Sequence, residues 1–241
     1  MIDNYPRFLN GYINLGTSLA SLGQYERAAE VTRQAQQLAP ERVSVYDNLV
    51  NYLLALQRFD EVRQIIREAQ TRKLDDYQLR NALYALFFFA ADSPAMAEQQ
   101  KWFAGNPDVE NMGLSLASDT EAYAGHLEKS RELTRRSTDS AGRADSKENA
   151  AIWLENSALR EAAFGNYTEA QQTAAAGIKF APGSQGVGVE AALAYAMSGD
   201  TANSESLAQD LNRRFPVDTH IQSLWLPAIH AQLALNRKNP A

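Results

Sequence analysis

The three histidines are the residues that metal binding or acid–base chemistry would have to use. They are His126, His220 and His230 in a chain of 241 residues. His220 and His230 are ten residues apart on an expected helix, about 15 Å at 1.5 Å per residue, which is too far for one metal ion. His126 directly follows Gly125, which we expect to end a helix. The spacing therefore favours surface or turn histidines over a metal site or a general base.

Other candidate chemistry is equally sparse. The segment 183–188, GSQGVG, resembles a phosphate-binding loop, but it follows an expected helix instead of a strand and contains no lysine. Asp75 and Asp76 fall in an expected loop, and Glu26 and Glu30 share an exposed helix face. None of these groups has the spacing of an acid–base site, so we expect no catalytic residue, no cofactor and no metal in this chain.

Composition excludes further classes of function. The absence of cysteine rules out thiol nucleophiles, disulfides and sulfur-ligated metals. A net charge of -6 argues against nucleic acid as a partner. Basic residues are frequent between Lys129 and Lys147, but acidic ones are interspersed, which favours a solvated helix face over an anion-binding patch. No apolar run reaches the roughly 18 residues of a membrane-spanning helix, and the start lacks a signal-peptide pattern, so we expect no membrane contact by this segment.

The elements that position these residues are predicted to be helices in a repeating pattern. Alanine is abundant and favours helix. Helix-ending and core positions recur every 34 residues: stepping from Gly23 reaches Gln57, Ala91 and Gly125, and Gly165 leads to Gly199. The spacing predicts helix pairs at about 9–42, 43–76, 77–110, 111–150, 151–184 and 185–218, followed by a terminal helix at 219–237. In the first pair, we expect Tyr12, Leu15, Leu19 and Tyr25 in the core, with Gly16, Ala28 and Ala35 allowing close approach.

Two irregularities modify this pattern. The step from Gly125 to Gly165 is 40 residues, so six extra residues should lengthen the second helix of the fourth pair and the first helix of the fifth. We expect this change to divide the binding groove into two halves. At the ends, Tyr5–Arg7 has the pattern of the tail of a preceding helix, and no second helix follows residue 237. The sequence thus predicts a single all-α solenoid over 1–241 that is a fragment of a longer array, or one whose last helix is a cap.

The residues Tyr12, Leu15, Gly16, Leu19, Gly23, Tyr25, Ala28, Ala35 and Pro40 reproduce the spacing of the tetratricopeptide repeat, and the chain resembles that family over about residues 5–238. The segments Tyr5–Arg7, Ala69–Asp75, Asp119–Asp145, Arg213–Thr219 and Trp225–Ile229 are similar to the repeat arrays of bacterial membrane-anchored serine/threonine protein kinases. Similar arrays also follow winged-helix DNA-binding domains. The resemblance implies a right-handed superhelix and a noncatalytic interaction or sensory region, with the kinase motifs themselves missing from this chain.

The resemblance also implies a concave groove lined by the first helix of each pair. The positions that should face it are Asn10, Ile13, Thr17, Asp47, Asn48, Asn51, Asn81, Phe88, Asp119 and Tyr123. An asparagine amide both donates to and accepts from an extended peptide backbone, so we expect a protein or peptide ligand there. The alternative is that these residues are only exposed polar faces.

Among groove ligands, a C-terminal carboxylate is disfavoured. Members of the family that bind one use lysine, asparagine and arginine, whereas the corresponding positions here hold Ile13, Asn48, Asn81 and Ala85. The leading hypothesis is a protein-binding module of a larger bacterial signalling protein, with a kinase as the expected parent. One alternative is a self-association scaffold, in which terminal helices such as that of Trp225 and Leu233 form a homodimer. The other is an array attached to a winged-helix regulator. The sequence leaves the ligand, the parent protein and the side of the membrane open.

Overall fold

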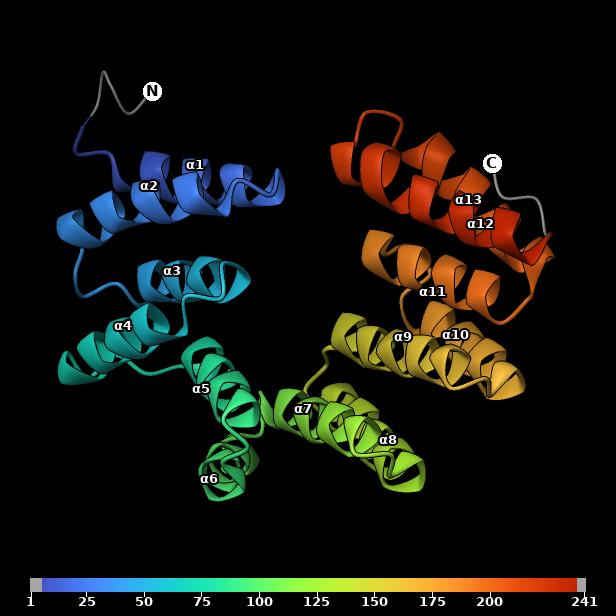
Figure 1. Ribbon diagram of the computed structural model, residues 1–241, viewed down its shortest axis with the longest axis horizontal. Helices are drawn as coiled ribbons and strands as arrows, with labels where there is room; N and C mark the ends of the chain where they lie inside the picture. Colours follow the sequence, from blue (N-terminus) through green and yellow to red (C-terminus); the bar gives the residue numbers. More distant parts are fainter. Residues whose placement is uncertain (1–5, 238–241) are drawn as a thin grey trace. The chain divides into compact units, whose positions relative to one another are not determined.

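The computed structural model describes residues 6–237, and within this range the chain forms helices and no β-strand (Figure 1). The fold is all-α, as the sequence predicted. The helices are α1 (Leu9–Ser21), α2 (Tyr25–Leu38), α3 (Val43–Ala55), α4 (Phe59–Thr71), α5 (Tyr77–Phe89), α6 (Ser93–Ala104), α7 (Glu110–Tyr123), α8 (Leu127–Arg143), α9 (Lys147–Ala163), α10 (Tyr167–Phe180), α11 (Gln185–Met197), α12 (Thr201–Arg214), the π-helical segment η1 (Ile221–Trp225) and α13 (Leu226–Asn236). The segments at Tyr5 and after residue 237, which bear on a longer array, lie outside the described residues.

The helices belong to two compact units, Met1–Trp102 and Phe103–Ala241, called the N-terminal and the C-terminal unit below. The division lies within α6 and upstream of the six-residue insertion. The sequence did not predict a division at this position. The idea that one solenoid spans residues 1–241 stays a prediction.

Each helix pair turns at a residue with a positive φ, the left-handed conformation that favours glycine. These residues are Gly23, Gln57, Ala91, Gly125, Gly165 and Gly199. Gln57 and Ala91 adopt φ values of 58° and 53° although they carry a Cβ atom. The turn positions that the 34-residue period predicts are therefore confirmed, including the two without glycine.

The insertion lengthens helices, as predicted. Helices α8 and α9 have 17 residues each, whereas the other α-helices have between 11 and 14. The turn between α8 and α9 contains Asp145, which has a φ of 53°. The predicted division of a groove at the insertion is not tested by these lengths.

Close helix packing in the first pair depends on Gly16. A Cβ atom at this position would lie 2.7 Å from Oγ1 of the buried Thr32 on α2, so either this side chain or the helix would have to shift. Tyr12 and Leu19 are buried, as expected, but Leu15 is 36% exposed. The expectation for Leu15 was wrong because no helix before α1 covers it among the described residues, whereas α2 covers the equivalent Leu49 on α3.

The first helices of the first two pairs are anchored by the same hydrogen bond. The hydroxyl of Tyr12 donates to the carbonyl oxygen of Pro6 at 3.1 Å, and the hydroxyl of Tyr46 donates to that of Pro40 at 2.8 Å. The two bonds are 34 residues apart, so the repeat in the sequence corresponds to a repeated contact. Each tyrosine holds the start of its helix on the proline-containing connection before it.

Hydroxyl groups replace apolar side chains between α7 and α8. The Oγ atom of Ser118 donates to the carbonyl oxygen of Ser130 and lies 2.8 Å from Oγ1 of Thr134. Ser137 donates to the carbonyl oxygen of Asn111 at 2.7 Å. Small residues allow these helices to approach closely, and their hydroxyls are hydrogen-bonded, as burial of polar groups requires.

The terminal helix begins with a π-helical turn, whereas the sequence predicted one regular helix over 219–237. Pro227, which has no N–H to continue the α-helical hydrogen bonds, follows directly. Of its apolar side chains, Ile221, Ile229 and Leu233 are buried, Trp225 is half-buried and Leu224 is 56% exposed. No helix between residues 6 and 237 combines the length and hydrophobicity needed to cross a membrane.

Candidate functional site

The first helices of the N-terminal unit lie next to one another, since α3 contacts both α1 and α5 (Figure 1). Seven of the groove residues predicted from the sequence belong to these helices and have exposed or half-buried side chains. They are Asn10, Ile13, Thr17, Asn48, Asn51, Asn81 and Phe88, and we call them the first-helix face. Of these, Asn10, Thr17, Asn51 and Asn81 are exposed, and the other three are half-buried.

Hydrogen bonds hold part of this face in place. Asn51 Nδ2 on α3 donates to Oε1 of Gln78 on α5 at 3.2 Å, which joins adjacent first helices. Asn10 Oδ1 accepts a long hydrogen bond of 3.5 Å from Arg42. The side-chain amides of Asn48 and Asn81 form no hydrogen bond with another described residue. These two amides are therefore free to donate to and accept from a ligand.

Phe88 belongs to an aromatic cluster at the end of α5. Its ring packs edge-on against Phe89 with centroids 6.0 Å apart, and Phe89 stacks on Phe59 of α4 at 5.1 Å. Phe89 is 64% exposed and Phe88 is half-buried. Phe88 follows Asn81 by two turns of α5, so the two residues lie on the same side of this helix.

Asp47 is the predicted groove residue that the structure removes from the surface. Its side chain is 2% exposed, so it cannot contact a ligand directly, and the expectation that it does so was wrong. Asp47 interacts with Asp76, at the start of α5. Burial, together with the adjacent Asp76 carboxylate, raises the pKa of Asp47 to about 8.

The remaining two predicted residues, Asp119 and Tyr123, are on α7 in the C-terminal unit. Tyr123 is 81% exposed. Asp119 forms an ion pair with Arg160 of α9, and partial burial raises the pKa of Asp119 while Arg160 opposes that shift. These two residues belong to the C-terminal unit, whereas the first-helix face belongs to the N-terminal unit.

Sequence reasoning missed a buried acid on α9. The Glu155 side chain is fully buried, and neither of its carboxyl oxygens has a hydrogen-bond partner. Burial raises its pKa to about 9, and the nearby Glu190 of α11 adds to the shift. The signal was present in the sequence, because Gly177 stands where the first pair has Ala35, and a Cβ atom there would collide with the Glu155 carboxyl group. The glycine leaves space for the acid.

A second missed feature is the ion pair that closes α8 onto α9. Arg131 donates through Nε and Nη2 to the two carboxyl oxygens of Glu161 at 2.7 and 2.8 Å. Hydrogen bonds from Arg131 and Asn166 lower the pKa of Glu161 although its side chain is only 6% exposed. Within the basic run 129–147, Arg131 and Arg143 are thus engaged with acidic residues. This pairing agrees with an ion-paired helix face.

The histidines do not assemble a metal site. His126 Nδ1 lies 2.8 Å from Glu121, one turn earlier. In the part of the chain that the structure describes, no three residues among histidine, cysteine, aspartate and glutamate are grouped for a metal ion. Residues 183–188 form the connection from α10 into α11, where Ser184 caps α11 and the Gly183 carbonyl accepts from Arg214.

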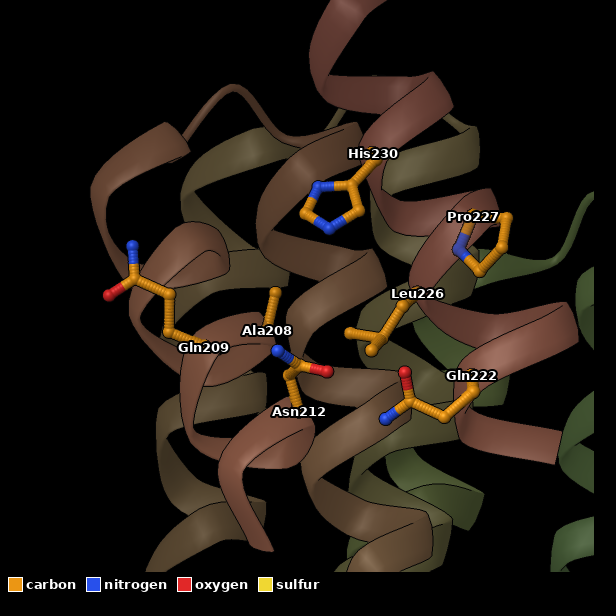
Figure 2. Close-up of a pocket in the computed structure, with 7 residues that line it drawn as sticks. All are labelled: Ala208, Gln209, Asn212, Gln222, Leu226, Pro227 and His230. Carbon is orange, nitrogen blue, oxygen red and sulfur yellow. The ribbon is translucent and has the colours of Figure 1, made fainter. Parts of the chain in front are cut away.

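His230 lines a pocket formed by α12, η1 and α13. The other lining residues are Ala208, Gln209, Asn212, Gln222, Leu226 and Pro227 (Figure 2). Figure 2 shows the amide groups of Asn212 and Gln222 directed toward each other, with Gln209 pointing away. Gln222 already donates to the carbonyl oxygen of Phe215 at 3.0 Å, which ties it to the connection before η1.

Comparison with known proteins identifies the fold. No protein-family model matches the sequence, and no curated protein matches it significantly. A tetratricopeptide repeat protein from Parabacteroides merdae has 14% identity and a TM-score of 0.52 over 96% of this chain and 87% of that one. PilW, a widely conserved type IV pilus biogenesis factor, has 14% identity and a TM-score of 0.49 over 90% and 97%. YrrB, a tetratricopeptide repeat protein with an unusual peptide-binding site, has 17% identity and a TM-score of 0.35 over 96% and 95%.

The first of these matches shows that the chain has a fold of the tetratricopeptide repeat type. The resemblance predicted from the sequence is confirmed at the level of the fold. None of the three concerns a kinase-associated array.

Proposed function

We propose that this chain is a noncatalytic protein- or peptide-binding module, and that the first-helix face is its binding surface. The observation that carries the proposal is the pair of unbonded amides, Asn48 and Asn81, on the adjacent helices α3 and α5. An asparagine amide satisfies both the N–H and the C=O of an extended peptide. An exposed hydrogen bond between Asn51 and Gln78 also joins helices α3 and α5.

The aromatic cluster supports the same proposal. Phe88 and the exposed Phe89 offer an apolar surface beside the amides, and aromatic anchors supply much of the affinity in recognition modules. A ligand would use the amides for its backbone and the aromatic rings for an apolar side chain. This combination gives selectivity as well as affinity.

Selection of peptides from a random-sequence display library on the immobilised full chain, followed by calorimetry, tests the proposal. Truncation of Asn51, Asn81 or Phe88 to alanine should weaken binding of a selected peptide at least about tenfold, which is about 1.4 kcal/mol, with little change in Tm. Gln64→Ala on α4 is the matched control, because Gln64 is exposed on a second helix and should leave binding unchanged.

Core truncations should have the reverse effect. Tyr12→Ala or Leu49→Ala removes a buried side chain and should destabilise the protein by about 2–4 kcal/mol. If the face variants melt the protein and leave binding intact, the binding and packing faces have been assigned the wrong way round. Failure to select any peptide would contradict the proposal itself.

The wider role rests on the sequence resemblance alone. We infer that the chain is the interaction or sensory region of a larger bacterial signalling protein, with a serine/threonine kinase as the leading parent and a winged-helix regulator as the alternative. Sequencing the complete reading frame tests this inference. A parent without either domain would contradict it.

A second candidate is self-association through the terminal helices. Leu224 and Leu235 are 56% and 61% exposed in η1 and α13, which favours an apolar contact there. Trp225 and Leu233, which the sequence suggested for this contact, are half-buried and buried instead. Light scattering over a hundredfold concentration range should show a dimer that Leu224→Glu abolishes, and a monomer throughout would exclude this role.

A further inference from the structure

We infer that the Asp47 and Asp76 carboxyl groups, at the junction of α3 and α5, form a site for a cationic side chain, lysine or arginine, of the peptide that occupies the first-helix face. This inference rests on the proposed function and names the chemistry of its ligand. Asp76 would contact the cation directly, and Asp47 would supply negative charge from beneath it.

The geometry of the pair leaves one buried oxygen without a partner. Asp47 is 2% exposed, and its Oδ1 atom has no hydrogen-bond partner. Asp76 is half-buried and caps α5, where its Oδ1 accepts from the backbone N–H groups of Gln78 and Leu79 at 3.0 and 3.1 Å. The cap fixes the Asp76 carboxyl group beside Asp47 and keeps it accessible from the surface.

No cation of the surrounding helices neutralises the pair. Helix α1 has no charged residue, and α3 contains no lysine or arginine. On α5, Arg80 forms an ion pair with Asp75 at 2.6 Å. Asp76 is the one charged group that acts on the Asp47 carboxyl group.

Basic residues of α2 and of the segments that precede α3 and α4 are engaged elsewhere. Arg33 of α2 pairs with Glu61 of α4, and Arg58, which precedes α4, lies 4.0 Å from Glu26 of α2. Arg42, which precedes α3, contacts Asn10 on α1. Asp47 and Asp76 form no ion pair with another described residue. Buried polar atoms are normally hydrogen-bonded, and Asp47 Oδ1 is not, so the pair is suited to a cation supplied by a ligand.

The protonation state makes the site dependent on pH. Because the pKa of Asp47 is raised to about 8, Asp47 holds a proton at neutral pH in the free protein. A bound ammonium or guanidinium group favours the ionised carboxylate, so binding releases this proton to solvent. Affinity should therefore rise about tenfold per pH unit below pH 8 and level off above it.

The neighbouring residues place the site within the first-helix face. Asn48 follows Asp47, and Asn51 lies one turn later on α3. Gln78 follows the Asp76 cap and bonds to Asn51. A peptide backbone held by these amides would carry a side chain to the carboxyl pair.

Titration of the full chain with two small probes, followed by NMR, tests the inference. The probes are Nα-acetyl-lysinamide and Nα-acetyl-norleucinamide, which differ in the ammonium group. The lysine probe should shift the side-chain amide signals of Asn51 and Gln78, with an apparent Kd about tenfold lower at pH 7 than at pH 6. The norleucine probe should not shift them.

Variants separate the pair from the rest of the surface. Asp47→Asn and Asp76→Asn should each remove the preference for lysine and its pH dependence. Asparagine caps helices as well as aspartate does, so Asp76→Asn keeps the start of α5 even if Asp47→Asn does not fold. Asp60→Asn on α4 is the matched control, because its side chain is fully exposed, and it should behave as the wild type.

Equal binding of the two probes, or a Kd for the lysine probe that does not change with pH, would overturn the inference. The absence of any shift from the lysine probe would overturn it as well. If library peptides bind the first-helix face without a preference for lysine or arginine, the inference fails and the proposed function stands. If no peptide binds at all, the proposed function fails.

Discussion

Replacement of Glu155 by glutamine should stabilise the protein, and the gain should grow with pH. Glu155 is fully buried with both carboxyl oxygens unbonded, and its pKa rises from an ordinary value of 4.5 to about 9. Between these values the folded protein keeps a proton that the unfolded chain releases. The free energy of unfolding therefore falls as pH rises, and the loss is absent below pH 4.5.

The magnitude follows from the pKa difference. Each pH unit between the two values costs about 1.36 kcal/mol, so at pH 7, which is 2.5 units above 4.5, the wild type has lost about 3 kcal/mol. Glu155→Gln keeps the volume of the side chain and is neutral at every pH. The difference in unfolding free energy between variant and wild type should thus be small at pH 5 and about 3 kcal/mol at pH 7.

Urea denaturation followed by circular dichroism at pH 5, 6, 7 and 8 measures this difference. Glu190 and Asp47 also have raised pKa values, near 6 and 8. They lower the unfolding free energy with rising pH in the wild type and in the variant, so the comparison of the two proteins isolates Glu155. Glu169→Gln on α10 is the matched control, because Glu169 is exposed and its replacement should give no pH-dependent gain. A difference between Glu155→Gln and wild type that does not vary with pH would refute the reasoning.

Three further predictions concern the packing. Gly16→Ala should destabilise the N-terminal unit by about 1–3 kcal/mol, measured by urea denaturation, because its Cβ atom would lie 2.7 Å from Oγ1 of Thr32; an unchanged midpoint would contradict this. Ala91→Gly should stabilise the protein by about 0.5–1 kcal/mol in the same assay, because it relieves a φ of 53° in the turn after α5. A loss of stability would show that the greater conformational entropy of glycine in the unfolded chain outweighs the strain. Arg131→Met should cost about 3–5 kcal/mol by leaving the buried Glu161 carboxylate unpaired, a cost that the double variant with Glu161→Gln should largely recover.

The sequence was sufficient for the helices and their turns because these depend on residues close together in the chain. Gly125, Gly165 and Gly199 stop helices through their own backbone conformation. The 34-residue period also predicted a turn at Gln57 and at Ala91, although neither residue is a glycine. Six extra residues likewise became longer helices, since added length in an uninterrupted helical segment continues the helix.

Which neighbour covers each helical position was decided only by the tertiary structure. The period places a residue on a given side of its own helix. From this alone we expected Asp47 in the groove and Leu15 in the core. Asp47 became buried because α5 brings Asp76 against it, and Leu15 stayed partly exposed because no described helix precedes α1. Glu155 is buried without a hydrogen-bond partner, in a space that exists because Gly177 of α10 has no side chain. Burial and charge depend on contacts between residues far apart in the chain, whereas a repeat pattern records spacing along it.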